Sequence, residues 1–323
     1  MTKVGLVGYG SMGRIHARIL DRMELLAAII EPSESNATKA SADFSVPIFS
    51  DLKSCDIELD SIVVAVPTPF HSTVVKDVFA KYPELKSMIL EKPISPTLAE
   101  AEELISTVEQ YRDRIIVGHV EIYNPVVQKF LEIMESGVYG SIRSFMIFRK
   151  GSVPQSRLKS LSDILVDIGV HDFDIVTRLV SGEIKVYTTG LTLEGSLNSA
   201  IISLSGDGFH GVIQLSREFS GKEREIVVEC EKATIKVDLI AQTIEIRGLR
   251  APEGDGASIS IPHGPGSSLK LYGEPLLIEI LNLRDIVSGA KPIVGLDDGI
   301  KTLKIVESCR ESIRVGAPIL LNL

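Results

Sequence analysis

Tryptophan is absent from this chain of 323 residues, and cysteine occurs only three times. Cys55, Cys230 and Cys309 are far apart, and none lies in the C-x-x-C spacing of zinc or redox motifs. This scarcity argues against a disulfide framework and against a cysteine-based zinc site. We therefore expect reduced thiols and a cytoplasmic location, because thiols stay reduced in that compartment.

Long hydrophobic runs are missing too. Stretches such as LLAAII (25–30) are far shorter than the roughly 20 apolar residues that a membrane-spanning helix needs. A strand-like KVGLVG begins at Lys3, so we expect no signal peptide. The sequence therefore predicts no membrane partner.

Positive charge is in the minority. The chain has 34 Lys and Arg against 43 Asp and Glu, which gives a net charge of −9 at pH 7. Nucleic-acid binding depends on basic patches that neutralise phosphates, and no run of Lys or Arg suggests one. We therefore expect no nucleic acid as the main partner.

Two kinds of segment alternate in the first 120 residues. Short runs rich in Val and Ile, typical of parallel strands buried on both faces, occur at 3–8, 25–31, 61–66, 87–92 and 114–119. Amphipathic helical patterns occupy 12–23, 70–82 and 97–111. This alternation predicts a doubly wound α/β domain of the Rossmann type over residues 1–120.

The pattern changes after residue 120. A helix that begins with Asn124 as its cap is expected at 124–137, followed by a strand at 141–150 and a longer helix at 161–182. From 184 to 247 the hydrophobic pattern has a period of two, which indicates a large, open, mostly antiparallel sheet. A loop rich in Gly, Pro and Ser (250–268) and two helices, near 274–289 and 297–315, complete the chain. We therefore predict a second, α+β domain over residues 121–323.

A glycine loop, GYGSMG, follows the first predicted strand and opens the first helix. Gly8 permits the tight turn, Gly10 lets the backbone approach a pyrophosphate, and Gly13 lets the helix pack closely on the strand. Ser11 and Met12 complete the loop at the helix N-terminus, whose free N–H groups favour an anion. The alternative is a tight turn without a ligand.

The end of the second strand indicates which dinucleotide the loop would bind. Glu31 stands there and can accept hydrogen bonds from the ribose hydroxyls of NAD. A carboxylate repels the 2′-phosphate of NADP, and no Arg follows that could receive this phosphate. The sequence therefore favours NAD over NADP.

Two further strand ends carry candidate site residues. Pro67, Thr68 and His71 belong to PTPFH and could line the cofactor site; alternatively they form a rigid connection in which His71 caps the next helix. Glu91 and Lys92 belong to EKPIS and are candidate contacts of the cofactor; a lysine there can also hydrogen-bond a substrate hydroxyl. The alternative for Lys92 is an ordinary solvated lysine.

The densest polar segment is DIGVHDFD, Asp167–Asp174. Asp167, His171 and Asp174 have the three- or four-residue spacing of neighbours on a helix. The pattern fits a metal site, although one His is a poor zinc set. It also fits a structural histidine, or a general base whose tautomer a carboxylate fixes.

Five motifs in order, GYGSMGRIHAR, VPTPFHSTVV, EKPIS, VGHVEIYNPVV and DIGVHDFDI, resemble the Gfo/Idh/MocA family of sugar and inositol dehydrogenases. The resemblance covers the whole chain. It implies that Lys92, Asp167 and His171 surround the nicotinamide, with His171 as proton acceptor and Lys92 polarising the reacting hydroxyl. It also implies that Tyr123 and Asn124 lie near the substrate. With Asp167 and His171 in these roles, we expect Asp174 to support them or to position the helix, Asp172 to be a bystander, and no metal to be bound.

Within the family, the chain looks most like the UDP-N-acetylglucosamine 3-dehydrogenase group, although Tyr123 stands where that group is expected to have Phe. The resemblance thus implies oxidation of a ring hydroxyl of a sugar, nucleotide sugar or cyclic polyol. The alternatives are a myo-inositol 2-dehydrogenase-like enzyme, a non-catalytic regulator that binds NAD and a sugar, and redox-neutral glycoside cleavage.

The same resemblance makes predictions about the second domain. Its open sheet would mediate a homodimer or homotetramer. If the substrate is a nucleotide sugar, Arg149, Lys150 and Arg157 become candidate diphosphate contacts. A solvated basic loop is the alternative for these three residues.

Overall fold

The computed structural model describes residues 2–154, 162–248 and 267–323. Contacts divide the chain into two compact units. The first unit comprises Met1–Val120 and Pro275–Leu303, and the second comprises Glu121–Glu274 and Lys304–Leu323. The sequence division after residue 120 assigned every later residue to the second domain, whereas the segment 275–303 packs with the first unit.

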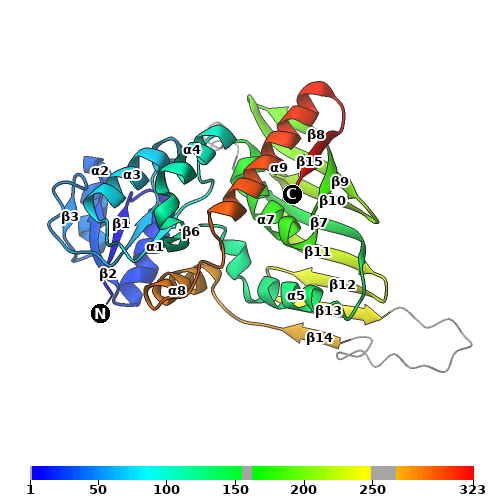
Figure 1. Ribbon diagram of the computed structural model, residues 1–323, viewed down its shortest axis with the longest axis horizontal. Coiled ribbons are helices and arrows are strands. Elements are labelled where there is room, and N and C mark those ends of the chain that lie inside the picture. The colour runs from blue at the N-terminus through cyan, green and yellow to red at the C-terminus, as the bar shows by residue number, and fades with distance from the viewer. Residues whose placement is uncertain (1, 155–161, 249–266) are drawn as a thin grey trace, which may run out of the picture. The chain divides into compact units, whose positions relative to one another are not determined.

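A six-stranded sheet forms the centre of the first unit (Figure 1), with the strand order β3-β2-β1-β4-β5-β6. Its strands are β1 (Val4–Val7), β2 (Leu26–Ile30), β3 (Ile48–Phe49), β4 (Ser61–Val64), β5 (Ser87–Leu90) and β6 (Ile115–Val117). All neighbouring pairs are parallel. The predicted Rossmann fold is therefore confirmed. The sequence pattern did not identify β3, which is only two residues long.

Helices cover both faces of this sheet. They are α1 (Ser11–Arg22), α2 (Glu34–Asp43), α3 (His71–Lys81), α4 (Leu98–Val108) and α8 (Pro275–Val287). α3 packs on α4 while α1 packs on α8, so the two pairs occupy opposite faces (Figure 1). The pattern missed α2 because Ala40 is its one buried residue, which gives it no apolar stripe.

The segment 275–303 joins the first unit through polar and apolar contacts. Ser87 in β5 donates a hydrogen bond to the Leu283 carbonyl in α8 (2.9 Å). The Val117 N–H in β6 donates to the Val294 carbonyl (3.0 Å). Leu283 is fully buried. Such long-range packing leaves no local signal, which is why the sequence pattern did not reveal the discontinuous unit.

A nine-stranded sheet forms the second unit, in the order β14-β13-β12-β11-β7-β10-β9-β8-β15. The strands are β7 (Ile142–Ser152), β8 (Glu183–Leu193), β9 (Ser196–Gly206), β10 (Phe209–Ser216), β11 (Glu218–Cys230), β12 (Ala233–Asp238), β13 (Thr243–Gly248), β14 (Ser267–Lys270) and β15 (Ile319–Asn322). β7 and β10 pair in parallel and the other pairs are antiparallel. The predicted mostly antiparallel sheet is confirmed. Of the expected loop 250–268, positions 250–266 lie outside the described residues. Its last two positions, 267 and 268, belong to β14.

One face of the second sheet carries helices and the other is open. α5 (Pro125–Glu135), the π-helical turn η4 (Leu165–Gly169) and α7 (Val170–Leu179) pack on the sheet, and α9 (Leu296–Val315) is tied to it where the Thr188 N–H donates to Ser312. The expected helix at 161–182 is thus shorter, since it starts as a π-helical turn and ends at Leu179. Side chains that point toward the helices are buried, whereas those on the opposite face are exposed or half-buried.

Candidate functional site

The carboxyl ends of the parallel strands meet at one edge of the first sheet. Val7 pairs with Ile30 and Val64, Val64 pairs with Leu90, and Leu90 pairs with Val117. The residues that follow these positions therefore emerge at the same level. This edge is where doubly wound sheets bind their ligands.

The glycine loop at this edge has the geometry that its sequence predicts. Gly8 has a φ of +93°, and a Cβ there would lie 2.7 Å from the Ala65 carbonyl oxygen. A Cβ on Gly13 would overlap the Gly8 carbonyl, so only glycine lets α1 pack this closely on β1. A Cβ on Gly10 would meet no atom within 4 Å. The backbone at Gly10 is thus open to a ligand at the start of α1, as a bound pyrophosphate requires.

Glu31 is held at the end of β2 by backbone donors. Its Oε2 accepts from the Tyr9 N–H (2.6 Å) and its Oε1 accepts from the Ser33 N–H (2.8 Å). The side chain is largely buried, and the first turn of the following helix adds the acidic Glu34. The carboxylate is therefore fixed beside the glycine loop in a setting that disfavours a further phosphate. These features fit NAD.

The PTPFH segment lies at the same edge. Pro67 is exposed and Thr68 is half-buried, so both are accessible to a ligand. His71 is only 1% exposed, and its Nε2 lies 3.0 Å from the Val66 carbonyl oxygen. Burial lowers the pKa of His71, which keeps the ring neutral. His71 thus ties the start of α3 to the loop after β4, but it is the first residue of α3 and not its cap, since Phe70 holds the N-cap position.

The two charged residues of EKPIS differ in their surroundings. Glu91 is 6% exposed, and its Oε1 lies 2.7 Å from Nε2 of the buried His16. Glu91 was expected to contact the cofactor, but its side chain points into the core, where it is bonded to His16. Lys92 is half-buried and directly follows it. Sequence reasoning missed His16, which lies in the GRIHAR motif but is too far along the chain to suggest this partner.

In the second unit, Asp167 lies in the π-helical turn η4 and His171 in the first turn of α7. Oδ2 of Asp167 accepts from Nη2 of Arg217 (2.7 Å), which also donates to the Ser162 carbonyl (2.7 Å). Arg217 is 3% exposed, whereas the Asp167 side chain is 30% exposed and His171 is half-buried. Sequence reasoning missed Arg217, which follows β10 and has no motif of its own.

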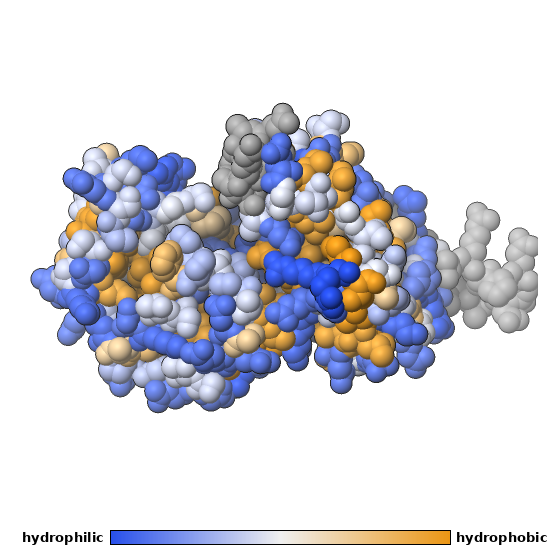
Figure 2. Space-filling view, turned by 90° about the horizontal axis from the view of Figure 1, so that it is seen from above, coloured by the Kyte–Doolittle hydropathy of each residue, from blue (hydrophilic) through white to orange (hydrophobic). Residues whose placement is uncertain are grey.

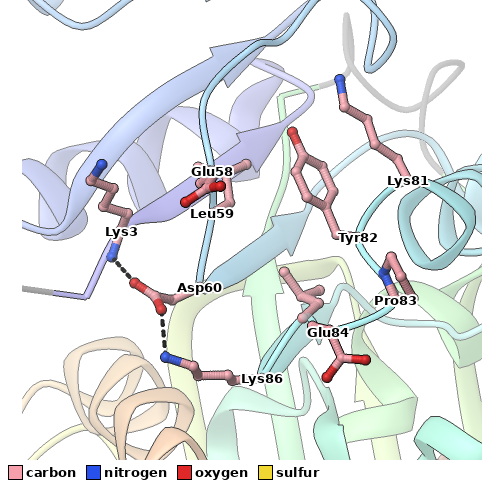
Figure 3. A pocket seen from close by; sticks show the side chains of 10 residues that line it. Lys3, Glu58, Leu59, Asp60, Lys81, Tyr82, Pro83, Glu84 and Lys86 are labelled. Carbon is pink, nitrogen blue, oxygen red and sulfur yellow. Dashed lines mark hydrogen bonds and ion pairs between the residues drawn. The ribbon is translucent and has the colours of Figure 1, made fainter.

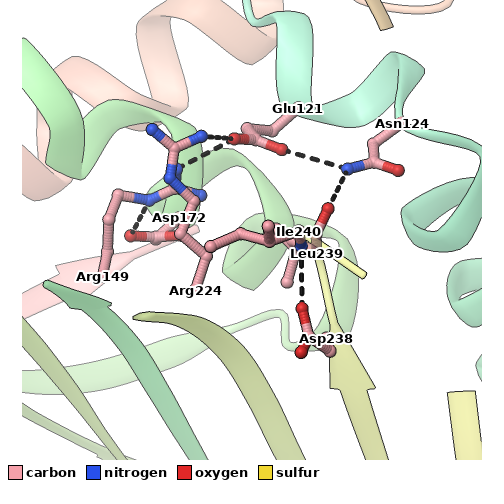
Figure 4. A network of polar contacts seen from close by, with 8 residues as sticks. All are labelled: Glu121, Asn124, Arg149, Asp172, Arg224, Asp238, Leu239 and Ile240. Carbon is pink, nitrogen blue, oxygen red and sulfur yellow. Dashed lines mark hydrogen bonds and ion pairs between the residues drawn. The ribbon is translucent and has the colours of Figure 1, made fainter. Parts of the chain in front are cut away.

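A buried ionic network lies beside this helix (Figure 4). Nε and Nη2 of Arg149 donate to the two carboxylate oxygens of Asp172 (both 2.8 Å), and Nη1 donates to Glu121 (2.9 Å). Arg224 also donates to Glu121 (2.9 Å). Burial lowers the pKa of Arg149, but the two carboxylates outweigh it, so the pKa rises and Arg149 stays charged.

This network corrects two sequence predictions. Arg149 was expected to be a diphosphate contact or a solvated residue, but it is a buried residue of β7 whose donors are taken by carboxylates. Asp172 is not a bystander, because it anchors α7 to β7. Lys150 pairs with Glu223 (2.9 Å). Arg157 lies outside the described residues.

The residues expected near the substrate after β6 are buried within the second unit. Tyr123 is fully buried. Asn124 caps α5 by accepting from the Val126 N–H (3.3 Å), and it donates to the Leu239 carbonyl (3.1 Å) and to Glu121 (3.4 Å). The amide of Asn124 therefore ties the start of α5 to the sheet and to the ionic network (Figure 4). Asp174 is buried and bonds Arg178 (2.9 Å), consistent with its expected helix-positioning role.

A pocket of about 590 Å³ lies at the opposite edge of the first sheet, beside the starts of β1, β4 and β5 (Figure 3). Asp60 there accepts from the Lys3 N–H (2.9 Å) and from Nζ of Lys86 (2.7 Å). Lys81 donates to the carbonyls of Leu52 and Cys55. Three charged side chains of this pocket, Asp60, Lys81 and Lys86, are thus bonded within the protein, and the pocket lies at the edge opposite the glycine loop.

Two negative findings apply to the described part of the chain. No group of three or more His, Cys, Asp or Glu side chains there is arranged to hold a metal ion. No helix in the described ranges combines the length and apolar character that crossing a membrane requires.

Comparison with known proteins supports the family resemblance. Residues 2–119 match the model of the GFO_IDH_MocA family, an oxidoreductase family with an NAD-binding Rossmann fold. The match covers the nucleotide-binding part of the chain, which therefore has the NAD-binding Rossmann domain of this oxidoreductase family. The resemblance to the family, the oxidoreductase class and NAD as cofactor, all predicted from the motifs, are borne out by this match.

Curated relatives extend over nearly the whole chain. The oxidoreductase YrbE of Bacillus subtilis is 24% identical over 99% of this chain and 97% of its own length. The myo-inositol 2-dehydrogenase of Thermotoga maritima is 24% identical over 96% of both. The UDP-N-acetylglucosamine 3-dehydrogenase of Acidithiobacillus ferrooxidans is 21% identical over 99% and 98%.

Solved structures share the fold of both units. The UDP-N-acetylglucosamine 3-dehydrogenase GnnA from Acidithiobacillus ferrooxidans has a TM-score of 0.81 at 20% identity, covering 97% of each chain. The WlbA dehydrogenase from Bordetella pertussis, in complex with NADH and UDP-GlcNAcA, has a TM-score of 0.82 at 19% identity, covering 100% of this chain and 98% of its own.

The two glycines of the loop predict opposite effects of the same substitution. Gly10→Ala places a methyl group in the open space that a pyrophosphate would fill, so the Kd for NAD rises about tenfold or more while the Tm is kept. Gly13→Ala forces α1 away from β1 and costs about 1–3 kcal/mol of stability. Calorimetric titration with NAD and thermal unfolding of both variants measure these effects. Equal losses of stability would contradict the distinct roles.

Proposed function

We propose that the chain is an NAD-dependent dehydrogenase that oxidises a ring hydroxyl of a sugar, nucleotide sugar or cyclic polyol to a ketone. The observation that carries this proposal is the shared edge of the first sheet. The glycine loop follows β1 and Lys92 follows β5, and the strand register brings both to the same level. A cofactor held by Gly8–Gly13 and Glu31 would thus be bound at the edge that carries Lys92.

The chemistry needs a hydride acceptor and a proton acceptor. The nicotinamide of bound NAD supplies the hydride acceptor. We assign the proton acceptor to His171, because histidine is the side chain that most often acts as a general base in active sites. Lys92 hydrogen-bonds the reacting hydroxyl and favours its ionised form. Asp167, held by Arg217, contacts the substrate or orients a partner group.

The substrate class rests on the named relatives. Their printed names include a myo-inositol 2-dehydrogenase and a UDP-N-acetylglucosamine 3-dehydrogenase, which both act on a ring carbon that bears a hydroxyl. The diphosphate contacts first considered for a nucleotide sugar lose Arg149, because it is buried against Asp172 and Glu121. A nucleotide sugar would therefore need other cationic contacts.

Turnover tests the proposal directly. Formation of NADH is measured with a panel of inositols, free aldoses and UDP-sugars for the wild type, Lys92→Ala and His171→Ala. Each substitution is expected to lower kcat by about 100-fold or more, because it removes an acid–base group. Lys76→Ala, which removes an exposed lysine on α3, is the matched control and keeps full activity. Undiminished turnover in both active-site variants would refute these roles.

Glu31 sets the preference for NAD over NADP in this proposal. Glu31→Ala removes the carboxylate that would bond the ribose hydroxyls and repel a 2′-phosphate. The kcat/KM for NAD should fall and that for NADP should rise, which steady-state kinetics with each cofactor measures. Asp21→Ala removes an exposed acid near the C-terminal end of α1, away from the glycine loop, and serves as the control. An unchanged ratio of the two kcat/KM values would count against Glu31 as the selective residue.

We also propose that a second copy of the chain covers the open face of the second sheet. Apolar side chains on this face include Met146, Tyr187, Ile201 and Leu320, which are 39–60% exposed. Figure 2 shows a band of hydrophobic surface on this unit.

We further propose a cytoplasmic location. The three cysteines are free and buried, which suits this proposal, because thiols stay reduced in that compartment.

Charge on the open face tests the assembly. Ile201→Glu and Met146→Glu place a carboxylate in the proposed interface and should convert a dimer or tetramer to monomers. Ile313→Glu is the matched control, since Ile313 is similarly exposed but lies on α9. Light scattering after size-exclusion chromatography gives the mass. A monomeric wild type, or unchanged mass in both variants, would refute the interface.

A further inference from the structure

His16 and Glu91 form a buried pair that joins two parts of the first unit. Nε2 of His16 lies 2.7 Å from Oε1 of Glu91, although the residues are 75 positions apart. His16 is fully buried and Glu91 is 6% exposed. His16 belongs to α1, which starts at the glycine loop, whereas Glu91 directly follows β5. The pair therefore connects the cofactor-binding helix to the segment that carries Lys92.

The second oxygen of Glu91 contacts this segment directly. Oε2 accepts from the backbone N–H of Lys92 (3.2 Å). A Cβ on Gly118, the residue after β6, would lie 3.2 Å from the same Oε2, so glycine lets the chain pass close to the carboxylate here. The carboxylate is thus bonded to His16 of α1 on one side and lies against the end of β6 on another. It in turn fixes the backbone of Lys92.

A second buried acid, Glu279 on α8, lies near Glu91, and the surroundings of the two carboxyl groups decide which one is ionised. Glu279 is fully buried, and within the described residues neither of its carboxyl oxygens has a hydrogen-bond partner. Burial and the nearby Glu91 raise the pKa of Glu279 well above its ordinary value, so it is neutral. Burial also raises the pKa of Glu91, but His16 and Lys92 outweigh it, and the pKa of Glu91 is lowered. Of the two buried acids, Glu91 therefore carries the charge.

We propose that His16 is a positioning residue for the reaction: through Glu91 it fixes the place of Lys92 at the carboxyl edge of the sheet. This inference rests on the proposed role of Lys92. The pair would control the position of Lys92, and a small displacement of a catalytic group lowers turnover strongly.

A double-mutant cycle separates positioning from a general contribution to stability. His16→Leu removes the contact with Glu91 and should lower kcat by about 10- to 100-fold, while the KM for NAD changes little. His16→Gln keeps an N–H donor and should restore most of kcat. In the Lys92→Ala background, His16→Leu should lower kcat no further, because the group that it positions is gone.

The matched control is Ser61→Ala. Oγ of Ser61 lies 2.7 Å from Oγ of Ser87 in a buried pair at the starts of β4 and β5, at the other edge of the same sheet. This variant should lower the Tm and leave kcat unchanged. If His16→Leu lowers kcat additively with Lys92→Ala, or if His16→Leu and Ser61→Ala behave alike, the positioning role is refuted.

Failure of the proposed function would look different. In that case the wild type would form no NADH with any substrate of the panel, or Lys92→Ala would keep full activity. The pair can still be tested by the NMR resonance of ¹³C-dimethylated Lys92. This resonance should move in His16→Leu and stay in place in Ser61→Ala, and an unmoved resonance in His16→Leu would overturn the inference.

Discussion

The parallel register of β1, β4 and β5 is the constraint on which the first unit depends. Each strand ends at the same level, so residues from three distant parts of the sequence emerge together. The glycine loop, the PTPFH connection and Lys92 all owe their shared edge to this pairing. Even the buried pair of His16 and Glu91 requires it, because Glu91 reaches α1 only from the end of β5.

In the second unit, paired charges position the candidate site residues, as the strand register does in the first unit. Arg149 and Asp172 hold α7 on the sheet, and Arg217 holds Asp167 one turn before His171. Buried ion pairs contribute little net stability compared with apolar packing, but breaking one partner away is costly. Their value here is therefore orientation, since each pair admits one arrangement of the helix that carries His171.

The sequence predicted the elements whose pattern is local. Strand periodicity, the glycine loop and the Asn124 cap could all be identified from neighbouring residues, and so could the resemblance that singled out Lys92, Asp167 and His171. It did not reveal the partners, because His16, Arg217 and Glu279 acquire their meaning only when distant segments meet. The same limit misassigned Arg149: a basic residue next to a predicted loop looks solvated until the strand places it against Asp172.

The discontinuity of the first unit has a consequence for synthesis on the ribosome. Ser87 of β5 and Val117 of β6 donate hydrogen bonds to the carbonyls of Leu283 and Val294. These two residues are translated after every strand of the nine-stranded sheet except β15. Domains generally fold as units as the chain emerges, N-terminal first. The nucleotide-binding unit can be completed only after most of the polypeptide has been made. Until α8 is synthesised, the part of the sheet at β5 and β6 lacks its packing partner. During synthesis, β5 and β6 would therefore be the strands of this sheet that a chaperone has to shield for longest.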